Sequence, residues 1–163
     1  MKSVFDKADE ARFKETLEEF SEGTSRVLPV LHFAQEVFGA ITPEVETYLA
    51  ERLDMPIARL HEVLTFYHLY REYPHGSYTL TVCNNLSCHL LGSEGLLEHL
   101  EKCLGIGPGE TTGDGLFTLE VSECIGACHQ APAFQVNGHF YGPVTLAEVD
   151  LLLKSLREGR EEV

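Results

Sequence analysis

The first 73 residues place apolar side chains three or four positions apart, the spacing that is typical of amphipathic helices. In the first such segment, Phe13, Leu17 and Phe20 share one face, and charged side chains fill the opposite face. The helices expected from this pattern cover residues 7–20, 24–38, 43–53 and 56–68. Because the connections between them are short, the pattern predicts an N-terminal helical bundle.

Residue types that favour helix ends support these boundaries. Thr24 suits an N-cap, and Gly39 suits the end of the same helix. Thr42 and Pro43 occupy the positions expected for the N-cap and the first residue of the third helix.

After Pro74 the period of the pattern changes to two. Tyr78, Leu80 and Val82 alternate with threonines, which predicts a strand that ends at Cys83. The remaining expected elements are a helix at 93–104, a strand at 116–121, a hairpin around Asn137-Gly138, and a closing helix that opens with the capping-box pair Thr145 and Glu148.

The order of these later elements predicts a small sheet of the thioredoxin type. Its first two strands are expected to be parallel, because the helix between them forms a right-handed crossover. The expected fold class is therefore mixed, α+β or α/β. An N-terminal helical bundle at 1–73 is followed by a thioredoxin-like α/β domain at 74–163.

The charge of the chain restricts its partners. Twelve Lys and Arg against 26 Asp and Glu give a formal net charge of −14. Phosphate backbones and anionic lipids repel such a chain, so we expect neither nucleic-acid binding nor direct membrane insertion. The helices at 43–53 and 56–68 are not interpreted as a helix-turn-helix, because residues 24–70 contain three Arg, no Lys and six acids.

The five cysteines are an odd number in a chain that starts without the apolar segment of a signal peptide. This argues against a disulfide framework, since the cytosol keeps thiols reduced. No apolar stretch reaches the roughly 18 residues that a spanning helix needs. We therefore expect a cytoplasmic protein, and a position on the cytoplasmic face of a membrane complex is consistent with this.

Four of the cysteines form two close pairs. Cys83 and Cys88 have a C-x4-C spacing, and Cys124 and Cys128 have a C-x3-C spacing. If the first two strands are parallel neighbours, both pairs leave the same edge of the sheet, where open α/β sheets hold their ligands. Two loops with two thiolates each suit a [2Fe–2S] cluster, in which each iron takes two thiolates.

Spacing alone leaves two other chemistries open. Both spacings suit a structural zinc site with four cysteines, which would make the chain a zinc-stabilised interaction module. A thiol–disulfide redox protein is the second alternative, although no C-x-x-C is present. For the iron–sulfur interpretation, Leu86 and Ile125 are expected to keep water away, and His89 and His129 are not needed as ligands. Cys103, on the apolar face of helix 93–104, is expected to be a buried structural thiol.

The chain as a whole resembles the thioredoxin-like [2Fe–2S] ferredoxin subunit of NADH:quinone oxidoreductase (complex I). NAD-linked hydrogenases and formate dehydrogenases share this family. The matching segments are LPVLHFAQEVFGAITPEV, PIARLHEVLTFYHLY, CNNLSC and LGIGPGETTGDGLFTLEVSECIGACHQAPAFQVN. They cover the helical part, both cysteine pairs and the hairpin that precedes the closing helix.

The resemblance implies that Cys83, Cys88, Cys124 and Cys128 hold one [2Fe–2S] cluster. It implies a one-electron carrier subunit of an NADH-linked oxidoreductase, with no independent catalytic site of its own. The implied partners are a flavoprotein subunit, which binds FMN and NAD(H) in place of this chain, and further iron–sulfur subunits.

The local charge predicts a low reduction potential for such a cluster. Between residues 77 and 145, Lys102 is the single Lys or Arg against seven acids. Reduction takes a four-thiolate [2Fe–2S] cluster from −2 to −3, which surrounding negative charge opposes. We expect a potential nearer the roughly −400 mV of plant-type ferredoxins than the values of Rieske centres.

Overall fold

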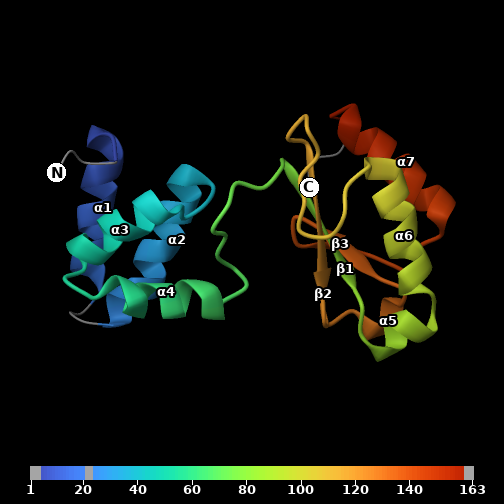
Figure 1. The fold of residues 1–163 in the computed structure, drawn as a ribbon, viewed down its shortest axis with the longest axis horizontal. Coiled ribbons are helices and arrows are strands. Elements are labelled where there is room, and N and C mark those ends of the chain that lie inside the picture. The colour runs from blue at the N-terminus through green and yellow to red at the C-terminus, as the bar shows by residue number, and fades with distance from the viewer. Residues whose placement is uncertain (1–4, 21–23, 160–163) are drawn as a thin grey trace. The chain divides into compact units, whose positions relative to one another are not determined.

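The structure is a computed structural model that describes residues 5–20 and 24–159. The chain divides into two units, Met1–Pro74 and His75–Val163, which run from blue to green and from green to red in Figure 1. The expected organisation into a helical domain at 1–73 and a thioredoxin-like ferredoxin domain at 74–163 stays a prediction.

The first unit contains the four expected helices. Their bounds are α1 Lys7–Glu19, α2 Val27–Phe38, α3 Pro43–Arg52 and α4 Ile57–Phe66. The start of the second helix differs from the prediction, because residues Thr24–Arg26 form a 3-10 turn and Arg26 precedes α2 without a side-chain cap. Gly39 ends α2 as expected, with a left-handed φ of 74° that favours glycine.

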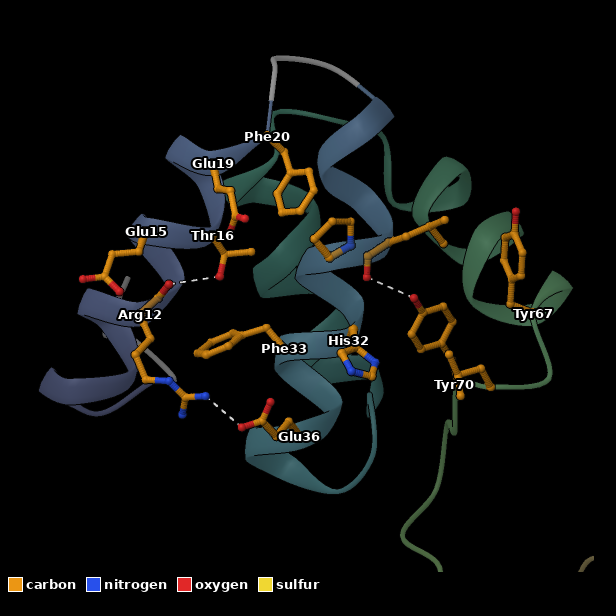
Figure 2. A pocket seen from close by; sticks show the side chains of 13 residues that line it. Arg12, Glu15, Thr16, Glu19, Phe20, His32, Phe33, Glu36, Tyr67 and Tyr70 are labelled. Carbon is orange, nitrogen blue, oxygen red and sulfur yellow. Dashed lines mark hydrogen bonds and ion pairs between the residues drawn. The ribbon is translucent and has the colours of Figure 1, made fainter. Parts of the chain in front are cut away.

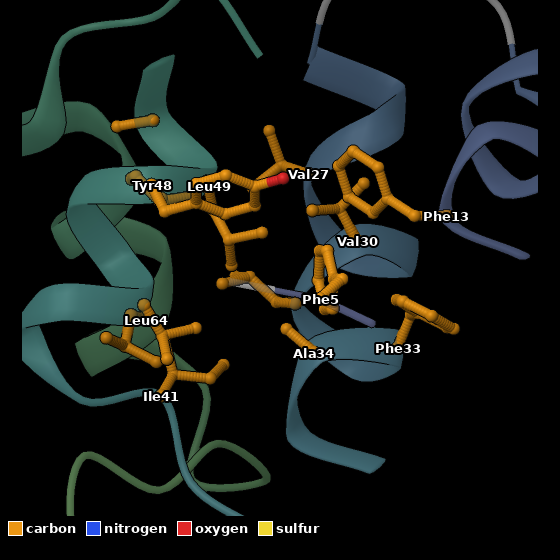
Figure 3. Close-up of a cluster of buried hydrophobic side chains, with 14 residues drawn as sticks. Phe5, Phe13, Val27, Val30, Phe33, Ala34, Ile41, Tyr48, Leu49 and Leu64 are labelled. Carbon is orange, nitrogen blue, oxygen red and sulfur yellow. The ribbon is translucent and has the colours of Figure 1, made fainter. Parts of the chain in front are cut away.

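The core of the helical unit is rich in aromatic rings (Figure 3). Phe5 packs among Phe13, Phe33, Phe38 and Tyr48, with ring centroids 5.1, 5.4, 5.1 and 5.5 Å away, respectively. Such pairs contribute about 0.5–1.5 kcal/mol each beyond their burial. These contacts tie α1, α2 and α3 together around the start of the described chain.

The second unit contains a four-stranded mixed sheet in the order β2-β1-β3-β4. Its strands are β1 Tyr78–Cys83, β2 Phe117–Ser122, β3 Phe134–Val136 and β4 His139–Tyr141. The predicted parallel pairing of β1 with β2 is confirmed, and β3 runs antiparallel to β1. The hairpin is also confirmed, with positive φ values of 48° at Asn137 and 89° at Gly138.

Two long helices cover the apolar face of this sheet. They are α6 Ser93–Leu104 and α7 Leu146–Arg157, and their leucines join Leu80, Val82 and Leu119 in one buried cluster. The expected capping box is present, since the Thr145 hydroxyl accepts from Glu148 N–H and the Glu148 carboxylate accepts from Thr145 N–H. Two short elements were not predicted, α5 Leu86–Leu90 and a 3-10 turn at Cys128–Gln130.

Over residues 5–20 and 24–159, no helix is both long and apolar enough to span a bilayer.

Gly142 lies where another part of the chain approaches closely. A Cβ at this position would collide with the carbonyl oxygen of Gln130 and lie 3.1 Å from that of Pro132. We expect Gly142→Ala to lower the free energy of unfolding by about 2 kcal/mol, since backbone must move to accept the methyl group. Urea unfolding followed by circular dichroism measures this change.

Gly95 in α6 is the matched control, because a Cβ there meets nothing within 4 Å. Gly95→Ala should raise the free energy of unfolding by about 0.5–1 kcal/mol through the higher helix propensity of alanine. Equal stabilities for the two variants would contradict the close approach at Gly142.

Candidate functional site

The first cysteine pair lies where β1 ends. Cys83 is the last residue of β1, and Cys88 lies in α5, and both side chains are buried. Asn85 is the N-cap residue of α5, and its side-chain oxygen accepts a hydrogen bond from Leu86 N–H at 2.9 Å. This turn brings the second cysteine back toward the first.

The second pair follows β2 at the same edge of the sheet. Cys124 comes two residues after the strand and Cys128 begins the 3-10 turn, and both are exposed. The two loops are tied together beyond the strands, since Asn84 N–H donates to the Ser122 carbonyl at 2.9 Å. In the register of β1 with β2, Cys83 pairs with Ser122, so the two loops begin at the same position along the paired strands.

The structure brings all four predicted cysteines together. The pKa of Cys83 is influenced by Cys88 and Cys124, and the pKa of Cys88 by Cys83 and Cys128, so the four thiols lie close enough to affect one another electrostatically. The Cys83 sulfur also lies 4.0 Å from the Glu123 carbonyl oxygen, one residue before Cys124. Two loops therefore bring two cysteines each to the same edge of the sheet.

The neighbouring groups shift the pKa of Cys83 downward. Burial opposes the charged form, but the backbone N–H groups of Asn85 and Ile125 and the thiols of Cys88 and Cys124 together lower the pKa of Cys83 below its ordinary value. The site thus makes the Cys83 thiol more acidic than an ordinary thiol, although burial acts in the opposite direction.

Cys88 shows the opposite shift. Burial raises its pKa, a nearby Ala133 N–H partly offsets this, and the adjacent Cys83 and Cys128 raise it further. Like charges so close together cannot all form without a cation to offset them. Four converging thiols therefore favour a bound cation when all of them are ionised.

The backbone of the second loop also supports negatively charged sulfur. Gly126 N–H points at the Cys124 sulfur, with a nitrogen–sulfur distance of 3.4 Å. N–H groups directed at thiolates stabilise their charge and are one of the means by which proteins tune iron–sulfur clusters.

The number and placement of the cysteines suit one metal ion as well as two. A single tetrahedral zinc with Zn–S bonds of about 2.3 Å holds its sulfurs about 3.8 Å apart. In the described residues, no three of these cysteine sulfurs all lie within 4.8 Å of one another. Two loops with two cysteines each match the ligand number of a [2Fe–2S] cluster, in which each iron takes two thiolates, and equally that of a four-cysteine zinc site.

Of the two apolar residues expected to shield the cysteines from water, one does so and the other does not. Ile125 packs against the cysteines together with Ala127 and Ala133, as expected of a residue that excludes water. Leu86, expected to do the same, is 69% exposed, because α5 turns its side chain outward. With Leu90 and Leu91, it forms an exposed surface that we name the α5 leucine patch.

Cys103 is separate from this site. It packs at the edge of the sheet's core but is half-buried and not buried as expected, and its sulfur lies 3.5 Å from both His99 Nε2 and Asp150 Oδ1. This group of three side chains was not predicted from the sequence. The four-residue spacing of His99 and Cys103 in one helix was the available signal, whereas Asp150 comes from another helix.

The helical unit has a cavity of its own, with a volume of about 730 Å³ (Figure 2). Its apolar lining includes Phe20, Phe33 and Leu28, and the carboxylates of Glu15, Glu19 and Glu36 stand around it. Arg12 bonds to Glu36 at 2.7 Å across one end, and Tyr70 donates to the Leu28 carbonyl at 3.0 Å at the other. We name this cavity the acidic groove.

A mixed sheet covered by two helices, with four thiols at the carboxyl ends of its parallel strands, defines a thioredoxin-like protein with a four-cysteine site. A sequence profile of the thioredoxin-like [2Fe–2S] ferredoxins matches residues 13–157, and the chain belongs to this family. Membership of this family implies a [2Fe–2S] cluster.

Relatives include an NADH-quinone oxidoreductase subunit of Rhizobium meliloti, which is 44% identical over 133 residues, 82% of this chain and 79% of the relative. NADH-quinone oxidoreductase subunit 2 of Thermus thermophilus is 42% identical over 135 residues, 82% of this chain and 75% of the relative. The recognised family and the predicted class of function, an electron-transfer ferredoxin of oxidoreductases, are confirmed.

Among solved structures, the air-oxidized NAD⁺-reducing [NiFe]-hydrogenase matches with a TM-score of 0.69 and 22% identity. The match covers 80% of this chain but 23% of the hydrogenase chain, so the likeness is one of fold. The predicted fold class is thereby confirmed.

Gly126 has a positive φ of 80°, so alanine at this position is strained. We expect Gly126→Ala to destabilise the protein by about 1 kcal/mol and to speed the loss of iron to a chelator several-fold, since its N–H would turn away from Cys124. Urea unfolding and the decay of visible absorption measure these effects.

Gly113 is the matched control, because it lacks a positive φ and a Cβ there meets nothing within 4 Å. Gly113→Ala should leave both the free energy of unfolding and the rate of iron loss unchanged. Iron loss at the same rate in both variants would argue against a role for the Gly126 N–H.

Proposed function

We propose that this chain is the one-electron carrier subunit of an NADH-linked oxidoreductase complex, with one [2Fe–2S] cluster held by Cys83, Cys88, Cys124 and Cys128. The observation that carries the proposal is the convergence of two cysteine pairs at the ends of two parallel strands. When bound, the cluster supplies reversible transfer of a single electron.

In this proposal the protein itself binds the cluster, shields it from water and docks to the partner subunit. Cys83 and Cys88 are buried and Cys124 and Cys128 are exposed, so the site has a side toward the core and a side toward a partner. Ile125 and the small Ala127 and Ala133 pack against the cysteines and limit the approach of water. No bond-making residue is required, because the redox chemistry is that of the cluster.

The partner in this proposal is a flavoprotein subunit that binds FMN and NAD(H), accompanied by further iron–sulfur subunits. The α5 leucine patch supports such docking, because it exposes large apolar side chains directly beside Cys88. The acidic groove offers a second contact for a basic and apolar segment of a partner, through the carboxylates around it. We also propose that the cluster has a low reduction potential and that the protein is located in the cytoplasm.

The zinc and thiol–disulfide alternatives make different predictions for composition. The match to the thioredoxin-like [2Fe–2S] ferredoxin family supports a two-iron cluster over a single zinc ion. The lowered pKa of Cys83, which follows from neighbouring N–H groups and thiols against the effect of burial, would suit a redox thiol as well as a ligand. Metal and sulfide analysis therefore decides among the three.

Protein purified without oxygen should contain about two irons and two acid-labile sulfides per chain. Serine in place of Cys83, Cys88, Cys124 or Cys128 should reduce the iron to less than about half and alter the visible spectrum, because each thiolate fills one of four ligand positions. Cys103→Ser is the matched control and should retain full iron and sulfide.

One zinc per chain without sulfide would identify a zinc module instead. Protein free of metal and sulfide, with disulfide-exchange activity that Cys83→Ser abolishes, would identify a thiol redox protein. Either result would overturn the proposed cluster.

Leu90 tests the docking surface, since it is 73% exposed in the α5 leucine patch. We expect Leu90→Glu to weaken binding to the flavoprotein subunit about tenfold, roughly 1.4 kcal/mol, by placing a charge in an apolar contact, without loss of iron. Binding of the two purified subunits by calorimetry measures this effect.

Leu151 of α7 is 68% exposed and is the matched control. Leu151→Glu should bind the flavoprotein subunit as the unchanged protein does. Unaltered binding of Leu90→Glu would show that docking uses another surface.

A further inference from the structure

Three side chains that commonly bind metals meet between α6 and α7, which lie side by side in Figure 1. His99 and Cys103 are one helical turn apart on α6, and Asp150 comes from α7. His99 Nε2 lies 2.7 Å from Asp150 Oδ1, and the Cys103 sulfur lies 3.5 Å from each of these two atoms.

These contacts do not form an acid–base relay. In a catalytic triad, one nitrogen of the histidine faces the nucleophile and the other faces the carboxylate. Here Nε2 of His99 makes both contacts. Burial and the adjacent Asp150 also raise the pKa of Cys103, although Arg157 opposes this, whereas a nucleophilic thiol needs a lowered pKa.

One atom from each of the three side chains lies within 3.5 Å of the other two, close enough for all three to bind one metal ion. A tetrahedral zinc ion with ordinary bond lengths separates sulfur from the nitrogen and oxygen ligands by about 3.5 Å, and nitrogen from oxygen by about 3.3 Å. The two sulfur distances already have this value. Only the hydrogen bond between His99 and Asp150 must open, by about 0.6 Å, when an ion replaces the proton.

Charge and ligand type point to the same class of ion. A thiolate, a carboxylate and a neutral imidazole carry −2 together, which balances a divalent cation. Sulfur and imidazole favour zinc and similar ions over magnesium or calcium. The His99 and Asp150 side chains are 23% and 55% exposed, so an ion can enter from solvent and retain water as its fourth ligand.

We propose that His99, Cys103 and Asp150 form a second metal site, which binds one zinc-class divalent cation between α6 and α7. The site is independent of the four cysteines at the sheet edge, and a bound ion joins the two helices that cover the sheet. Binding releases the proton of the Cys103 thiol.

The test uses the full chain loaded with its cluster. After incubation with zinc and gel filtration, elemental analysis should find about one zinc per chain with the iron content unchanged. His99→Gln, Cys103→Ser and Asp150→Asn should each weaken zinc binding at least tenfold. Glu101→Gln, a carboxylate change elsewhere on α6, should bind zinc normally.

Two further measurements test zinc binding on the protein without substitutions. Zinc should slow alkylation of Cys103 at least tenfold, as mapped by peptide mass spectrometry. Cobalt should produce a thiolate-to-metal absorption band on top of the cluster spectrum. Three results would overturn the proposal: no retained zinc, zinc retained equally by the three ligand variants, or zinc gained only as iron is lost.

Discussion

The parallel pairing of β1 with β2 is the constraint on which the candidate site depends. The register places Cys83 beside Ser122, so the loops that follow the two strands begin at the same level. A hydrogen bond from Asn84 to the Ser122 carbonyl carries this alignment one residue past the strands. A shift of the pairing would separate the two cysteine pairs, and therefore the helical crossover that makes the strands parallel also makes the site possible.

Electrostatics links the site to its ligand. The pKa of Cys83 is lowered despite burial, because backbone N–H groups and neighbouring thiols favour its charge, whereas burial and nearby sulfurs raise the pKa of Cys88. The fold thus makes the Cys83 thiol more acidic and the Cys88 thiol less acidic than an ordinary cysteine. In the proposed function, binding of the cluster to these thiols contributes to the stability of this edge of the sheet.

Local signals made most of the fold predictable. The alternation in β1, the Asn137-Gly138 turn and the capping box of Thr145 and Glu148 are short-range features, and each is present where the pattern predicted it. The 3-10 turn before α2 and the short α5 were not predicted, since three to five residues carry too weak a periodicity. The outward direction of Leu86 follows from α5, and the group of His99, Cys103 and Asp150 depends on how two helices pack, so neither could be predicted from spacing along the chain.

The proposed function requires that two metal ions, and not one, occupy the four-cysteine site. X-ray absorption at the iron edge of the anaerobically purified protein tests this requirement, because it reports the atoms around each metal. We expect sulfur neighbours together with a second iron as a nearby scatterer. An isolated metal ion with four sulfur neighbours and no second metal would contradict the two-iron cluster.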